Sequence, residues 1–112
     1  MALKKIADFP EFETRSSLTL IMWQEPLSKK DFLALLAKKL RFPSYFGMNW
    51  DAAAECLAGL ASLKKQTIRL IFPAVPLKSA REMKTFETVL ADAQEQLRTC
   101  GVTLEAEIVG QD

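Results

Sequence analysis

The sequence contains no histidine, only four glycines and no long apolar run, and each absence excludes a class of function. Without histidine, the chain has no imidazole to act as a general base, a pH switch or a metal ligand. The glycines, at positions 47, 59, 101 and 110, are too far apart for a G-x-G-x-x-G fingerprint or a phosphate-binding loop. The apolar run from Leu18 to Trp23 is too short to cross a bilayer. We therefore expect no bound cofactor, no metal and no membrane association.

A strong charge of either sign is also missing. The 15 Lys and Arg residues nearly balance the 14 Asp and Glu residues, which gives a net charge of +1. This balance argues against a polycation and against a generally acidic mimic of nucleic acid. The two cysteines, Cys56 and Cys100, form no C-x-x-C pair, and Met1 to Ser17 has no apolar segment typical of a secretory leader. We expect two free thiols and a cytoplasmic protein.

Three segments have the periodicity of helices. Ser28 is a typical N-cap, and apolar residues at helical spacing follow it until Pro43 stops the helix. Asn49 or Asp51 begins a second helix that reaches about Leu60. The third helix has the strongest period, with a predicted apolar seam of Met83, Phe86, Leu90, Ala93, Leu97 and Cys100.

The third helix also has clear boundary signals. Ser79 and Glu82 form a capping box at its start, and Gly101 stands where a left-handed C-terminal cap is wanted.

Three strands alternate with these helices. They are expected at Leu18 to Trp23, Thr67 to Phe72 and about Thr103 to Val109. Because long helical connections separate them, we expect an α/β fold with a three-stranded parallel sheet and right-handed crossovers. In the last strand, Leu104, Ala106 and Ile108 should face the core, with Glu105 and Glu107 outside.

The domain is expected to span residues 18–112. Met1 to Ser17 remains as an N-terminal extension, either an extra turn or a loose surface segment.

The chemistry is concentrated at the start of the second helix. Residues 42–63 hold two acids, Asp51 and Glu55, and no Lys or Arg. Their spacing of four places both on one helical face. Ala54 and Ala58 flank them on that face, and Tyr45 and Asn49 lie just upstream.

These acids allow a plainer interpretation, a solvated face that stabilises the helix dipole. Catalysis by the pair is not expected, because an exposed face does little to separate the two pKa values and no activated nucleophile lies nearby. We therefore predict that the chain is not an enzyme. Residues 29–41 carry five bases, which indicate a solvated face or a weak RNA-phosphate patch: Lys29, Lys30, Lys38, Lys39 and Arg41.

The loop and second helix resemble the signature of the barstar family of ribonuclease inhibitors, P-x-Y-[YF]-G-x-N-x-D-A-x-x-[DE]-C-L. Every fixed position of this pattern is occupied here, by Pro43, Tyr45, Phe46, Gly47, Asn49, Asp51, Ala52, Glu55, Cys56 and Leu57. The order of elements also matches, so the resemblance extends over residues 18–109.

The resemblance implies a barstar-like α/β domain with a three-stranded parallel sheet and three main helices. It also implies a cytosolic immunity protein that binds a basic, toxin-like ribonuclease, is monomeric when free and does not itself bind nucleic acid. Glu55 would enter the nuclease cleft in place of a substrate phosphate, with Asp51 as the second acid. Tyr45 and Asn49 would line the rim, and Gly47 would let the loop approach the partner.

The chain departs from the family at several positions. The best-known member has aspartate in place of Glu55, tryptophans in place of Ala54 and Leu60, and a hydroxyl in place of Ala58. A nuclease with a differently shaped cleft is therefore the expected partner, because aromatic anchors usually carry much of the binding energy. In the late helix, Asp92 and Glu95 are the candidate acids, and Trp50 belongs either to the interface or to the core.

The alternative is a barstar-like module without a nuclease target. It would contact RNA or another protein, using the basic residues 29–41.

Overall fold

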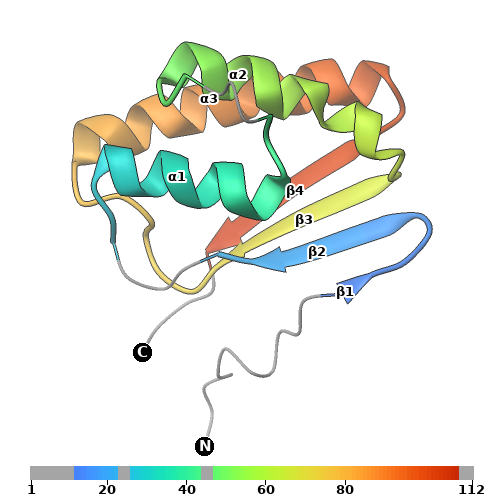
Figure 1. The fold of residues 1–112 in the computed structure, drawn as a ribbon, viewed down its shortest axis with the longest axis horizontal. Helices are drawn as coiled ribbons and strands as arrows, with labels where there is room; N and C mark the ends of the chain where they lie inside the picture. The colour runs from blue at the N-terminus through green and yellow to red at the C-terminus, as the bar shows by residue number, and fades with distance from the viewer. Residues whose placement is uncertain (1–11, 23–25, 44–46, 109–112) are drawn as a thin grey trace, which may run out of the picture.

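The computed structural model describes residues 12–22, 26–43 and 47–108. The elements are β1 (Phe12–Glu13), β2 (Ser17–Ile21), α1 (Lys29–Leu40), α2 (Trp50–Ala58), the 3-10 helix η2 (Gly59–Leu63), β3 (Thr67–Phe72), α3 (Ala80–Thr99) and β4 (Thr103–Ile108). Figure 1 shows the three α-helices gathered on one side of a single sheet. Among the described helices, none combines the length and the apolar character needed to cross a membrane.

The predicted parallel sheet is confirmed. Strands β2, β3 and β4 lie side by side in that order, all parallel, with β3 in the centre. The structure adds a short fourth strand that the sequence did not predict: β1 pairs antiparallel with β2, with Phe12 opposite Thr19. The segment before Leu18 thus contributes both β1 and the first residue of β2, Ser17. Residues 1–11, Trp23 and Val109 lie outside the described residues.

The register of the sheet aligns apolar side chains across the three parallel strands, on the face that the helices cover. Leu18, Ile68 and Leu104 stand opposite one another across the three parallel strands, and all three are buried. The helices complete this core with buried side chains from α1, α2 and α3: Phe32, Leu33, Leu36, Leu40, Ala53, Leu57, Phe86, Ala93 and Leu97.

Two predicted core positions are wrong. Ile108 is 46% exposed, because it ends β4, which is the edge strand of the sheet among the described residues. Cys100 is exposed, because α3 ends at Thr99 and the chain turns away at Gly101. Ala106 is only half-buried.

The predicted caps Ser28 and Ser79 are confirmed, and of the two starts expected for the second helix, Asn49 and Asp51, the structure has Asn49 as the cap. Ser28, Asn49 and Ser79 each have extended backbone, and each side chain accepts a hydrogen bond from a backbone N–H in the first turn. Gly101 adopts φ +81°, the left-handed conformation expected after α3. At the end of α1, Arg41 takes this role with φ 60°, so the helix ends at Leu40, three residues before Pro43.

A carboxylate joins β1 to the helical layer. Glu13 receives Arg41 at 3.0 Å and Lys65 at 2.9 Å, one base on each carboxylate oxygen. Hydrogen bonds from Lys65 and then Arg41 lower the pKa of Glu13 below its ordinary value of 4.5. The ionised form of Glu13 is therefore favoured by the folded chain.

We predict that Glu13→Gln lowers the thermal unfolding temperature at neutral pH. A depressed folded-state pKa contributes stability above the unfolded value of 4.5, and this contribution is lost as pH falls through the folded value. The difference between variant and wild type should therefore shrink in acid and vanish once Glu13 is protonated. Thermal melts followed by circular dichroism across this range check the prediction, and a difference independent of pH would contradict it.

Candidate partner-binding site

The start of α2 is fixed by one amide side chain. The Asn49 Oδ1 accepts a hydrogen bond from the Ala52 N–H at 2.7 Å, and its Nδ2 donates to the Gly47 carbonyl at 3.3 Å. A Cβ at Gly47 would lie 3.2 Å from that same Nδ2, tighter than most real contacts. The loop thus has an internal reason for glycine at this position. The expected close approach of Gly47 to a partner stays a prediction.

Trp50 turns toward the core. Its ring centroid lies 6.2 Å from that of Phe32 and 6.1 Å from that of Phe86, and the side chain is half-buried. The indole Nε1 donates a hydrogen bond to Glu82 Oε1 at 2.7 Å. Trp50 therefore holds α2 against α1 and α3, and only its remaining exposed part is left to meet a partner. Contact with a partner stays a prediction for this residue.

The opposite side of α2 carries the two acids. Asp51 and Glu55 are both exposed, while Ala53 and Leu57 on the inner side are fully buried. Within the described part of the chain, neither acid forms a salt bridge. Ala54 and Ala58 are half-buried on the same outer side, so little side-chain bulk surrounds the carboxylates. We call Asp51, Ala54, Glu55 and Ala58 the acidic face of α2.

One exposed apolar residue beside this face, Met48, was not predicted from the sequence. Met48 is 38% exposed and has φ 58°, the left-handed region that non-glycine residues rarely adopt. It stands between Gly47 and Asn49, two residues before α2 begins at Trp50. The position of Met48 in the loop is the only sign of this exposure in the sequence, since an apolar residue is ordinarily expected to be buried. Unusual backbone of this kind often lies at binding sites.

A hollow of about 290 Å³ adjoins the acidic face, between the end of α1 and the end of α2. Glu55 and Cys56 line one side, and Arg41 and Pro43 line the other. Burial of Cys56, and then the negative charge of Glu55, raise the pKa of its thiol above the ordinary value of 9.0. Cys56 therefore stays protonated at neutral pH, in keeping with a packing role.

The other predicted acids and bases are less suited to one surface. Glu95 forms an ion pair with Arg98 one turn later on α3, and this contact lowers the pKa of Glu95. Asp92 is exposed. On α1, Lys29 and Lys38 are nine residues apart in the chain, which is about 14 Å along a helix, so the basic residues gather at its two ends. Arg41 is already paired with Glu13.

Tyr45, predicted for the rim, lies outside the described residues, as does Phe46. Within the described ranges there is no group of three or more His, Cys, Asp or Glu residues that could hold a metal ion.

The comparison with known families agrees with this arrangement. Residues 18–109 match the family described as Barstar (barnase inhibitor). The chain belongs to the barstar family. That description is of a ribonuclease inhibitor and not of an enzyme. The comparisons with the curated proteins and with the solved structures found no match to the chain. The match spans the parallel sheet, all three α-helices and the acidic face of α2.

We predict that Trp50→Phe lowers the free energy of unfolding by about 1.5–3 kcal/mol, because it removes a hydrogen bond to a charged group. The shorter ring keeps most of its contacts with Phe32 and Phe86. Urea denaturation followed by circular dichroism measures the change. A variant that weakens partner binding while its stability stays at the wild-type value would contradict the core role assigned to Trp50.

We also predict that Cys56 reacts with a thiol reagent more slowly than the exposed Cys100. Its raised pKa leaves less thiolate, and its partial burial limits access. Glu55→Gln removes a nearby negative charge and should speed the reaction of Cys56 while leaving that of Cys100 unchanged. The rates are measured with single-cysteine variants, Cys56→Ala and Cys100→Ala. Equal rates at the two thiols would contradict the prediction.

Proposed function

We propose that this protein is an inhibitor of a basic ribonuclease, which it blocks by placing the acidic face of α2 in the nuclease active site. The observation that carries the proposal is the exposure of Asp51 and Glu55 on one side of α2, free of salt bridges among the described residues. Membership in a family described as barnase inhibitors supports the same function.

The physical basis is the chemistry of the nuclease cleft. An enzyme that cleaves RNA holds a phosphate with guanidinium and ammonium groups, and these groups accept a carboxylate with charge-assisted hydrogen bonds. Glu55 supplies this carboxylate in the proposal, with Asp51 one turn earlier. Since neither acid has an internal cation to give up, binding the partner breaks no ion pair within the described chain.

The shape of the surface suggests how the complex is completed. Ala54 and Ala58 leave a flat strip beside the carboxylates, so a partner must bring its own bulky side chains to fill it. Met48 supplies a flexible apolar contact at the edge of this strip. The hollow beside Glu55 has room for one partner side chain. We propose Asn49, Gly47 and Tyr45 as rim residues of the same surface.

The charge of the whole chain adds little to long-range attraction, because it sums to +1. Attraction of a basic partner must therefore come from the local field of residues 42–63, which hold two acids and no base. In this proposal the protein acts in the cytoplasm of the cell that makes the nuclease, is monomeric when free and has no catalytic activity. The alternative of RNA binding through α1 gains no support, since its bases lie at the two helix ends.

We expect Glu55→Ala to weaken the complex by about 2–5 kcal/mol, because it leaves buried cations of the nuclease without a partner. Glu55→Gln keeps the side-chain length and removes only the charge, so it should weaken binding as well. Asp51→Ala should have a smaller effect in the same direction. The measurement is residual cleavage of a fluorogenic RNA by barnase, and by any small basic nuclease encoded beside this gene, at increasing inhibitor concentration.

The matched control is Glu87→Ala, which removes an exposed acid from α3 and should inhibit like the wild type. Circular dichroism and thermal melts must show that all four variants fold. Inhibition by Glu55→Ala equal to that of the wild type would overturn the proposed role of the acidic face. Absence of inhibition of every nuclease tested, by folded wild-type protein, would remove the support for an inhibitor.

A further inference from the structure

The outer edge of β4 is a second surface, built from different elements than the acidic face. β4 is the last strand in the sheet order, with β3 on one side. The Thr103 N–H donates to Gln66 on the β3 side. Because the backbone groups of a parallel strand alternate in direction, Leu104, Ala106 and Ile108 point their N–H and C=O groups away from the sheet.

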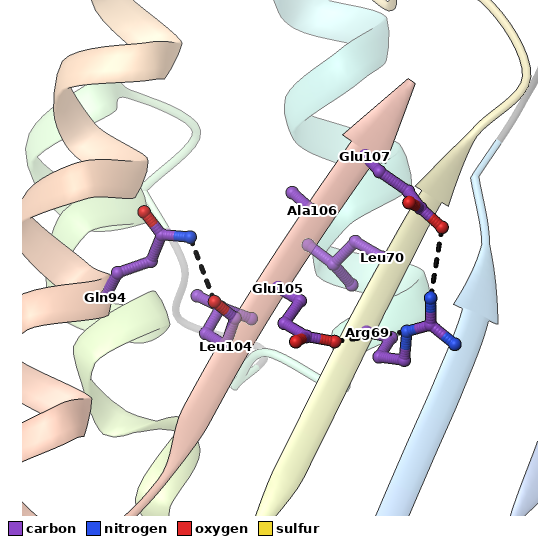
Figure 2. A pocket seen from close by; sticks show the side chains of 7 residues that line it. All are labelled: Arg69, Leu70, Gln94, Leu104, Glu105, Ala106 and Glu107. Carbon is purple, nitrogen blue, oxygen red and sulfur yellow. Dashed lines mark hydrogen bonds and ion pairs between the residues drawn. The ribbon is translucent and has the colours of Figure 1, made fainter. Parts of the chain in front are cut away.

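One of these edge groups is already occupied. The Gln94 Nε2 reaches from α3 and donates to the Leu104 carbonyl at 2.9 Å, as Figure 2 shows. The described residues provide no such partner for the outward N–H and C=O groups of Ala106. The outward carbonyl of Leu104 is therefore paired with a side chain of α3. The outward backbone groups of Ala106, next along the edge, are open to a further strand.

Two hollows flank this open part of the edge. One, of about 350 Å³, lies around Leu104, Ala106 and Gln94 and extends to Arg69. The other, of about 230 Å³, lies between α3 and β4 and is lined mostly by apolar residues, Phe72, Met83, Phe86, Leu90, Ala106 and Ile108, together with Glu87 and Glu107. An extended chain beside β4 would place every second side chain over this apolar hollow.

The opposite face of β4 is acidic. Glu105 and Glu107 project there and share a single arginine, Arg69, at 3.2 Å and 3.1 Å (Figure 2). Two carboxylates against one guanidinium leave a net negative charge beside the open edge. A strand added here would place its own side chains of that face next to these glutamates, where opposite charges stabilise the pair and like charges do not.

This charge pattern selects the occupant. In a second copy paired antiparallel about Ala106, Glu105 of one chain would stand opposite Glu107 of the other, which is unfavourable. We propose that the outer edge of β4 docks an extended basic segment of a partner protein, which adds a strand to the sheet. Its cationic side chains lie beside Glu105 and Glu107, and its alternating apolar side chains fill the hollow against Leu90 and Met83. The site does not depend on the proposed inhibition of a nuclease.

The probe is a short synthetic peptide that alternates lysine and valine, and the matched control peptide alternates glutamate and valine. Titration of isotope-labelled full-length protein, followed by amide NMR, should move the signals of Leu104, Ala106 and Ile108 with the lysine peptide alone. Hydrogen exchange of the Ala106 amide should slow when the peptide is bound, since this N–H gains an acceptor.

Ala106→Pro removes one outward N–H and none of the hydrogen bonds to β3, so the sheet should keep its four strands. We expect it to weaken peptide binding about tenfold relative to Ala106→Val, which keeps the N–H. Glu107→Gln should also weaken binding, and the loss should be smaller at high salt.

Several results would overturn the proposal. These are no shift at β4 with the lysine peptide, equal binding of the glutamate peptide, or equal affinity of the Ala106→Pro and Ala106→Val proteins. A further contrary outcome has two parts: the Glu105→Thr/Glu107→Thr protein self-associates, and the wild type does not bind the peptide. This outcome would mean that the glutamates only protect the edge from aggregation. Should Ala106→Pro not fold, the slowing of Ala106 exchange in the wild type decides the question.

Discussion

The rotational setting of α2 on the core is the constraint on which the rest of this structure depends. Ala53 and Leu57 are fully buried on one side of the helix, and Trp50 ties its first turn to Glu82 of α3. With a period of 3.6 residues, this burial forces residues 51 and 55 to the opposite side. The exposure of the two acids is therefore a consequence of core packing.

The surface charge of the protein depends on which acidic residues have basic partners. Glu13, Glu95, Glu105 and Glu107 all form ion pairs with basic residues of the chain. Such exposed pairs contribute little stability individually, but they neutralise the surface where they occur. Asp51 and Glu55 lack such partners among the described residues, so a near-neutral protein still presents a local negative field.

Much of the fold was predictable because its signals are local. The caps Ser28 and Ser79 and the left-handed Gly101 depend on neighbours within a few residues, and all three were predicted correctly. The cap Asn49 was one of two starts expected for the second helix, with Asp51 as the other. The spacing of Asp51 and Glu55 likewise placed them on one face, as observed. The errors lie where distant segments decide: the strand pairing of Phe12 with Thr19, the exposure of Ile108 at a sheet edge, and the turn that exposes Cys100.

The sequence by itself determined the order of elements, the parallel sheet, the family and the two acids, since periodicity, capping and a dense motif are written in consecutive residues. Tertiary structure alone decided that Trp50 faces the core, that Met48 is exposed and that β4 has an open edge. These properties depend on which atoms arrive from elsewhere in the chain. No pattern along one segment states whether a neighbour will cover it.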